Sequence, residues 1–335
     1  MTNFLATTAM ALCLSGGICI PQCIALENQA NIENKEIAPD TYNQLRQIML
    51  KGSSDELRQL IQKGLNTNGM YHCETPLNMA ISSLAYAFGS ATGYPPENAI
   101  EKVKILIKSG ADINFEPCAP ATTPLVTAIQ LPLEMYSFEE SFNNAIDEEI
   151  ESSQETESCL GGAIPKPCDA LTPEDKQAIK ESIHETYETA RRNLVPYMME
   201  IIEILTDNGA NINASDLNKK TPLHRAALTP QNITLEPLKF LIERGANVNA
   251  QDINGNTPLF IAYSCNNISA VNLLINAGAD VTIRNRDGLL YNQVIGNIER
   301  KYLDKEGHIK KDDNFGVKYN CLLYTSPSPR DSTSS

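Results

Sequence analysis

One pattern recurs five times along this 335-residue chain and strongly limits how it can fold. In each copy a glycine follows a helix-like segment, with a leucine four residues before it and another aliphatic residue seven before it. The two aliphatic residues lie on one helix face, and glycine is the usual left-handed residue beyond a helix C-terminus. The glycines are Gly64, Gly110, Gly209, Gly245 and Gly278. The pattern therefore predicts a series of repeated helical units.

A second marker, Thr-Pro-Leu, begins another helix in four of these units. Threonine can cap a helix N-terminus with its hydroxyl, and proline is already shaped for the first helical position. An alanine five residues after each threonine leaves room for two helices to approach closely. The threonines are Thr75, Thr123, Thr221 and Thr257. Each unit should contain a helix from Thr-Pro-Leu, a turn, a second helix that ends at glycine, and a connector.

The markers are unevenly spaced because the turn between paired helices expands in two neighbouring units. The expansions predict insertions at about residues 82–97 and 130–195, whereas the connector behind each threonine keeps nearly the same length. The uninterrupted period, from Gly245 to Gly278, is 33 residues. Within the larger insertion, Thr172 is a strong helix start, and Ile183 and Tyr187 fall at helical spacing. That helix should pack against another part of the chain.

With its 33-residue period and the stretch TPLHRAA at 221–227, the chain resembles the ankyrin repeat family. The resemblance covers residues 41–304 apart from the insertions, as about four full units and a degenerate cap at each end. It implies an all-α repeat solenoid of helix-turn-helix units, with β-hairpin-like connectors and a helical, acidic insertion. His224 should then tie neighbouring units by hydrogen bonds. Lys219 departs from the family pattern because glycine is usual there.

Both ends of the chain are set apart from the repeats. Residues 1–25 resemble a secretory signal, with an apolar run and a small residue at the cleavage site, although no Lys or Arg precedes the run. Residues 26–40 would be a flexible leader and residues 305–320 a tail. Residues 321–335 can be back-translated into a transposase-type sequencing adapter, so we expect them to be an artefact. The expected protein is bacterial and exported, periplasmic or secreted; if the N-terminal segment is not a signal, it is cytoplasmic.

Five cysteines remain between the two ends. Cys73 and Cys118 lie in successive connectors, which stacked repeats bring side by side, so a disulfide between them is expected. Cys159 and Cys168 flank a turn-rich loop suited to local closure. In an exported protein these four residues would form two disulfides, with Cys265 as the odd thiol. In a cytosolic protein all five thiols would stay reduced.

The composition and motifs argue against several functions. The net charge of −14 and the pI near 4.8 disfavour nucleic acid as a partner, because phosphate binding needs a basic face. His184 and the glutamates after it lack the second histidine of the zinc-protease pattern, and His72 with Cys73 has no second ligand pair. We therefore expect no catalytic residue, no metal, no cofactor, no enzyme activity, and no membrane span in the mature chain.

The family resemblance implies a non-catalytic protein–protein interaction module. Stacked repeats of this kind present a surface made of connector tips and first helices, so the expected partner is another protein. The positions that the resemblance implies are Leu217, Asn218, Lys220, Ile253, Asn254 and Asn256 in connectors, and Ser264 and Cys265 in a first helix.

The larger insertion suggests an alternative. Residues 134–157 carry nine acidic residues and no basic one, which fits either a solvated loop or a surface for a basic partner. In the second case the protein would be an inhibitor or protective partner of an exported enzyme or toxin. The two insertions would form one lobe, with the aromatic residues Tyr86, Phe88 and Tyr94 and the acidic residues Glu139, Glu140, Asp147, Glu148 and Glu149.

Overall fold

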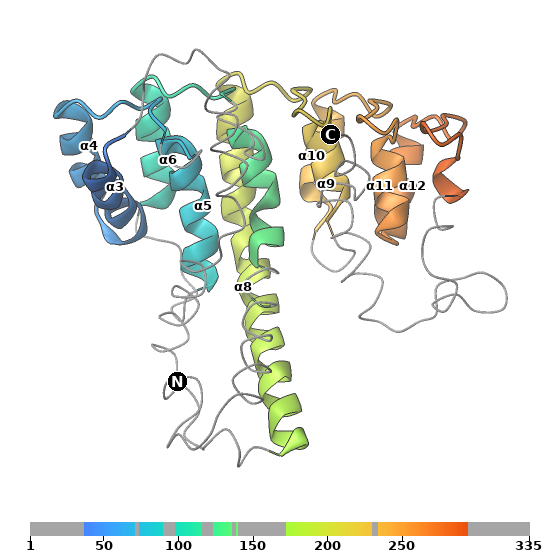
Figure 1. Cartoon of the computed structure of the whole chain (residues 1–335), viewed down its shortest axis with the longest axis horizontal. Helices are drawn as coiled ribbons and strands as arrows, with labels where there is room; N and C mark the ends of the chain where they lie inside the picture. Colours follow the sequence, from blue (N-terminus) through green and yellow to red (C-terminus); the bar gives the residue numbers. More distant parts are fainter. Residues whose placement is uncertain are drawn as a thin grey trace, which may run out of the picture. The chain divides into compact units, whose positions relative to one another are not determined.

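The chain divides into two compact units, Met1–Ala210 (unit 1) and Asn211–Ser335 (unit 2). The computed structural model in Figure 1 describes residues 37–70, 74–89, 98–115, 123–135, 139, 172–229 and 234–293. In this part of the chain the regular structure is helical, and no helix combines the length and hydrophobicity that a membrane span requires. The fold is an all-α repeat fold, as the sequence predicts.

Unit 1 is built from successive helix pairs. The helices are α3 (Pro39–Lys51), α4 (Ser54–Gln62), α5 (Pro76–Gly89), α6 (Ala99–Lys108), a helix over residues 124–135, and α8 (Pro173–Asp207). Helix α3 packs against α4 within its pair and against α5 of the next, and α4 packs against α6. Helix α8 packs against both α5 and α6.

Unit 2 contains two shorter pairs. The first is α9 (Pro222–Ala227) with α10 (Glu236–Glu243), and the second is α11 (Pro258–Ser264) with α12 (Ile268–Asn276). The two first helices, α9 and α11, also pack against each other.

A further helix start follows α12 at the end of the described chain. The backbone N–H of Leu290 donates to the side-chain oxygen of Gln293 at 3.0 Å, as a residue at a helix N-cap does. This start occupies the place of the predicted trailing unit, most of which lies outside the described residues.

The predicted glycine turns are confirmed in all five repeats. Each glycine is left-handed, with φ between 86° and 99°. The residue after it donates its N–H to the leucine carbonyl four positions before the glycine, at 2.9–3.2 Å. The glycine N–H donates three residues back, which completes a Schellman motif. Every second helix therefore ends with the same change of chain direction.

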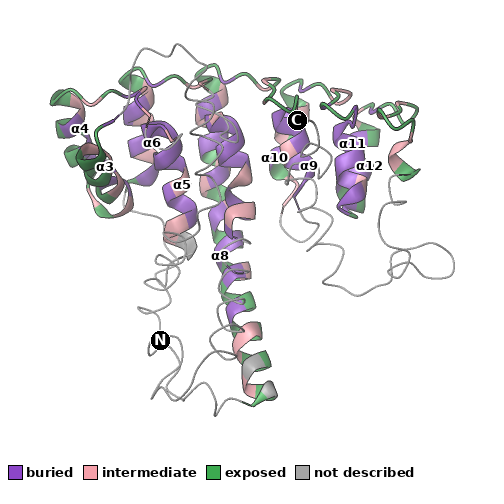
Figure 2. Ribbon diagram, in the orientation of Figure 1, coloured by how far each residue is buried: buried purple, intermediate pink, exposed green. Residues whose placement is uncertain are grey.

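The marker residues also form the core. The alanines after Thr-Pro-Leu and the aliphatic residues before each glycine are buried, as Figure 2 shows along the facing sides of the helices. The alanines are Ala80, Ala128, Ala226 and Ala262, and the aliphatic residues are Leu57, Leu60, Val103, Leu106, Ile202, Leu205, Leu238, Leu241, Val271 and Leu274. Because a single helix pair cannot bury these faces alone, the repeats are stable only when stacked.

Asparagines four residues after the glycines join neighbouring repeats. In unit 1, Asn68 accepts the N–H of Asp112 at 2.7 Å and donates to the carbonyl of Gly110 at 2.9 Å. In unit 2, Asn249 accepts the N–H of Asp280 at 2.8 Å in the same way. The sequence predicts a turn at these positions, and the structure adds a polar link between successive turns.

Helix α8 joins the larger insertion to the repeat without a break. It begins at Thr172, whose side chain and that of Asp175 exchange hydrogen bonds with each other's backbone N–H. It then continues through Pro196 for 35 residues, a length of about 50 Å at 1.5 Å per residue. Ile183 and Tyr187 are buried, as their spacing predicts. Figure 1 shows α8 extending well past α5 and α6 of the same unit.

Several predicted features lie outside the described residues and stay predictions. These are the signal at residues 1–25, most of the leader, and the tail and adapter segment from residue 305 onward. The same holds for the disulfide cysteines Cys73, Cys118, Cys159 and Cys168, for Tyr94 and the Phe88 side chain, and for Glu140, Asp147, Glu148 and Glu149.

Replacing Lys219 by the glycine that is usual at this position should make the protein more stable. Lys219 has φ 56°, and the equivalent residues in the next two connectors are Gly255 and Gly288, at φ 76° and 75°. A left-handed conformation costs a residue with a Cβ about 1 kcal/mol or more. Lys219→Gly should therefore raise the free energy of unfolding by about 0.5–1 kcal/mol in urea titrations, after the entropy that glycine gains when unfolded. Lys219→Ala keeps the Cβ, and an equal gain from alanine would refute the backbone explanation.

Candidate protein-binding surface

Three connectors of unit 2 close with the same turn. In each turn an Asp or Asn side chain accepts the backbone N–H of the residue four positions later, at 2.8–3.0 Å. The backbone N–H of that Asp or Asn donates to the carbonyl of the same later residue, at 2.9–3.1 Å. The turns run from Asp216 to Lys220, from Asp252 to Asn256 and from Asn285 to Leu289. Two hydrogen bonds between the same two residues fix the shape of each turn.

Hydrogen bonds also connect successive turns. The N–H of Ile253 donates to the carbonyl of Asn218 at 2.8 Å, and the N–H of Arg286 donates to that of Asn254 at 2.9 Å. These bonds join equivalent positions, because Ile253 and Arg286 each directly follow the residue that begins their turn. The turn tips therefore form one row in a fixed register.

His224 fastens this row to the helices beneath it. Its Nδ1 accepts the N–H of Thr221 at 3.1 Å, and its Nε2 lies 3.0 Å from the carbonyl oxygen of Asn256 in the next connector. Since a carbonyl can only accept, Nε2 carries the proton. The side chain is buried, and this burial lowers the pKa of His224. The predicted structural role of His224, a link between repeats, is confirmed.

Some of the predicted contact residues lie at the turn tips. Leu217 is 67% exposed and Ile253 is 37% exposed. Asn218 and Asn254 are exposed beside them, and Lys220 is half-buried. These residues are accessible, while their role in binding stays a prediction.

The other three predicted contact residues are buried, so their selection as surface residues is wrong. Asn256 closes its turn and accepts from His224 through its backbone carbonyl. Ser264 donates its hydroxyl to the carbonyl of Ile261 at 2.8 Å, and Cys265 is only 2% exposed. The physical reason is that α11 has only seven residues, so Ser264 and Cys265 fall at its end, in the packed corner before α12.

Three exposed cations of the same connectors are not among the residues that the sequence predicts at a binding surface, namely Lys219, Arg284 and Arg286. Counting residues from the Asp or Asn that begins each turn would have located these cations in the sequence. By that count Arg286 is equivalent to Leu217 and Ile253. The "connector face" hereafter means the exposed residues Leu217, Asn218, Lys219, Ile253, Asn254, Arg284 and Arg286.

The structure also corrects the prediction that Glu139 belongs to an acidic binding surface, for a different reason. It is buried, and its Oε2 accepts from Nη1 of Arg191 at 2.8 Å while its Oε1 lies 2.7 Å from Nδ1 of His184. Nη2 of Arg191 donates to Glu188 at 2.7 Å, and the Arg191 side chain is only 1% exposed. Glu139 therefore forms an internal ion pair with Arg191 of α8, and its carboxylate is not available to a basic partner. Tyr86, from the smaller insertion, is half-buried near the end of α5.

A second polar group, made of half-buried residues, lies in unit 1. The Tyr42 hydroxyl donates to Glu74 at 2.9 Å, and burial raises the pKa of Glu74. Burial, with the charge of Glu74, raises the pKa of Glu134 to about 8. Such carboxyls can act as acids or bases where they line a substrate cleft. Neither of them lines the pocket that the structure describes.

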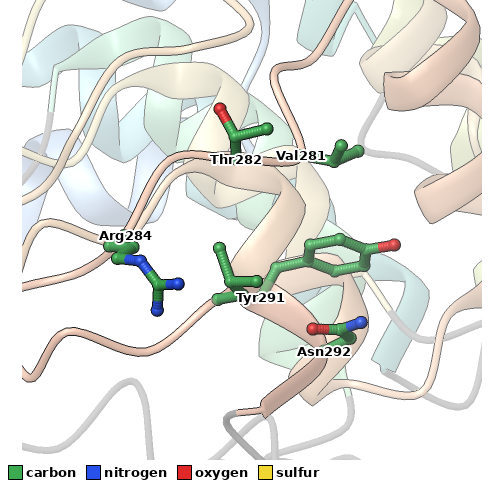
Figure 3. A pocket seen from close by; sticks show the side chains of 6 residues that line it. Val281, Thr282, Arg284, Tyr291 and Asn292 are labelled. Carbon is green, nitrogen blue, oxygen red and sulfur yellow. The ribbon is translucent and has the colours of Figure 1, made fainter.

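That pocket lies in unit 2 beside the last described residues and has a volume of about 520 Å³. Figure 3 shows the labelled side chains around it, from Thr282 and Arg284 to Tyr291. Arg284 donates to the carbonyl of Gly288 at 2.6 Å, and the Tyr291 ring meets Tyr263 edge-on at 5.3 Å. Its lining side chains include no carboxylate, thiol or imidazole, so it offers no acid–base pair or activated nucleophile.

The comparisons agree with the repeat geometry. Residues 194–285 match the family model described as ankyrin repeats in three copies, which spans the last part of α8 and all of α9–α12. The chain thus carries ankyrin repeats, which are general protein–protein interaction modules and typically non-catalytic. A comparison with curated proteins found no match. In unit 1 before residue 194, the repeat assignment rests on the glycine turns at Gly64 and Gly110 and on the helix pairs.

Removing Arg191 should destabilise unit 1 strongly. Arg191→Met would leave the carboxylates of Glu139 and Glu188 without their cation in a buried setting. Breaking a buried ion pair in this way costs about 3–5 kcal/mol. Arg192→Met is the matched control because Arg192 is the exposed neighbour on the same helix, and its effect should stay within about 0.5 kcal/mol. Urea unfolding followed by circular dichroism measures both, and similar losses for the two variants would contradict an internal role for Arg191.

His224 should make stability fall in mild acid. Its folded-state pKa is lowered, so the stability that the neutral ring provides is present above the unfolded pKa of about 6.5 and is lost as the pH falls below it. The free energy of unfolding should therefore drop more between pH 7 and pH 5 in the wild type than in His224→Gln. The carboxyls with raised pKa act equally in both proteins, and identical slopes for the wild type and His224→Gln would refute the assignment.

Proposed function

We propose that this protein is a non-catalytic adaptor that binds another protein through the connector face of unit 2. The observation that carries the proposal is the row of turn tips, where Leu217 and Ile253 are exposed at equivalent positions. A single exposed aliphatic residue is common on protein surfaces. Here two of them occupy equivalent positions on adjacent turns, which the bond from Ile253 N–H to the Asn218 carbonyl holds in register, so the row presents an apolar strip of two residues.

The rigidity of the connector face favours binding. Two hydrogen bonds close each turn, and one more hydrogen bond joins each turn to the next. A surface that is already ordered loses little conformational entropy when a partner binds, so more of the contact energy remains as affinity. The buried His224 adds to this order because it fixes the second turn to α9.

We further propose that the protein acts outside the cytoplasm. This proposal rests on the sequence of residues 1–25 and on the placement of the cysteines, both described above. Intact-mass measurement of the protein secreted or released from the periplasm tests it. A chain that still begins at Met1 would contradict export by a cleaved signal.

The alternative is an inhibitor or protective partner of an exported enzyme or toxin, acting through the acidic insertion. The run of acidic residues supports it. The burial of Glu139 limits the acidic surface to the residues after it. The two functions therefore predict different contact regions, which variants can separate.

The test is a pull-down from the compartment that holds the protein, with four forms of the full chain. Leu217→Ser with Ile253→Ser should reduce capture of the bound protein at least tenfold. Ile268→Ser with Ile275→Ser is the matched control, because these aliphatic residues are exposed in the same unit but lie on α12. Deletion of residues 140–171 spares α8 and the Glu139 ion pair, and it should leave capture unchanged.

Two results would overturn the adaptor proposal. If the connector variant captures as much protein as its α12 control, the connector face is not the contact surface. If only the deletion abolishes capture, the acidic insertion binds the partner and the inhibitor alternative holds.

A further inference from the structure

The connector face carries a charge opposite to that of the whole chain. The formal net charge is −14, yet Lys219, Arg284 and Arg286 are all exposed on this face. Half-buried Lys220 directly follows Lys219 in the same turn, and burial is the main reason that its pKa is lowered.

Two of the three acidic residues of these turns, Asp216 and Asp252, contribute little charge at the surface, so the exposed Asp287 is left opposite three exposed cations. Asp216 accepts the N–H of Lys220 and forms an ion pair with Arg225 at 2.6 Å, with only 14% of its side chain exposed. Asp252 is buried and accepts the N–H groups of Asn254 and Asn256. Asp287 is the exposed acid of the described turns. The surface that a partner would meet is therefore basic, with an apolar strip within it.

The order of residues along the row suggests a matching order in a ligand. Leu217, Ile253 and Arg286 occupy equivalent positions in three successive turns. Packed helices lie about 8–10 Å apart, which is close to one turn of a polyproline II segment, three residues at about 3.1 Å each, in which side chains three residues apart lie on the same face. An extended segment lying along the row would thus meet two apolar positions, Leu217 and Ile253, and then the basic Arg286, at intervals of about three residues.

From these features we infer that the connector face binds a partner protein through an extended acidic segment, with apolar residues spaced three apart and acidic residues beside them. The inference rests on the proposed function and names the chemistry of its partner. Carboxylates on the segment would pair with Lys219, Arg284 and Arg286, and its apolar side chains would cover Leu217 and Ile253. A nucleic acid would pair with the cations but would leave the apolar strip in water.

The defined probe is a fluorescein-labelled 12-residue peptide with leucines three residues apart and glutamates at the other positions. Two matched peptides replace every glutamate by lysine or every leucine by serine. Fluorescence anisotropy with the full chain at low salt should show the acidic leucine peptide binding at least tenfold more tightly than either matched peptide. Its affinity should fall as salt is raised, because the pairs lie at an exposed surface.

Charge reversal locates the site. Lys219→Glu with Arg286→Glu should weaken binding of the acidic peptide at least tenfold. Lys239→Glu with Arg244→Glu makes the same charge change at exposed positions on and directly after α10, and it should weaken binding less than threefold. Equal losses for the two double variants would overturn the inference, because the charge of the whole chain would then explain binding. A single-stranded oligonucleotide that competes as well as the peptide would overturn it also.

Three further outcomes separate the remaining explanations. If the full chain forms a dimer that is abolished both by Lys219→Glu with Arg286→Glu and by deletion of residues 140–171, the acidic segment belongs to a second copy and the external partner is refuted. If the Leu217 and Ile253 variant loses the captured protein while charge reversal retains it, the adaptor function stands and the acidic chemistry fails. If both variants retain it, both proposals fail.

Discussion

The turn at the end of each second helix is the constraint on which the rest of the structure depends. A left-handed glycine lets the following N–H reach back to the leucine carbonyl, and this happens five times with nearly the same geometry. The leucine that supplies the carbonyl also fills the core, so one residue position controls both the end of the helix and its packing. Within unit 2 the connectors then leave in the same direction, and their tips meet at equivalent positions.

The insertion shows how a repeat tolerates extra chain. Its helical part is the first half of α8, and the same helix continues into the repeat as the element that packs against α5 and α6. Helical hydrogen bonding continues past Pro196, so the added turns need no separate core where they join the repeat. Arg191 then holds Glu139 against this helix through a buried ion pair. The continuous helix α8 and the buried ion pair between Arg191 and Glu139 thus hold the insertion at the repeat.

The two errors of prediction have a common physical origin. Position within a repeat predicted that Ser264 and Cys265 would lie on a binding surface, but α11 ends at Ser264 and the chain turns inward there. The acidic run predicted an exposed Glu139, but this residue forms a buried ion pair with Arg191, which is 52 residues away in the sequence. Glu139 is buried by a contact with a distant residue, whereas Ser264 and Cys265 are buried in the packed corner where α11 ends. In both cases tertiary packing decides the burial, and the local sequence carries no signal for it.

The sequence by itself determined the repeated unit, because glycine turns, proline helix starts and the i, i+3 spacing of aliphatic residues are local physical preferences. It also indicated the role of His224, because the stretch TPLHRAA resembles the ankyrin repeat family, in which this histidine ties neighbouring units. Only the tertiary structure decided which polar residues remain at the surface. Stacking buried Asn256 and Asp252 inside the turns and left Lys219, Arg284 and Arg286 outside. A chain with an excess of acidic residues thereby presents a basic connector face, because hydrogen bonds and an ion pair within the turns occupy the aspartates that would have balanced it.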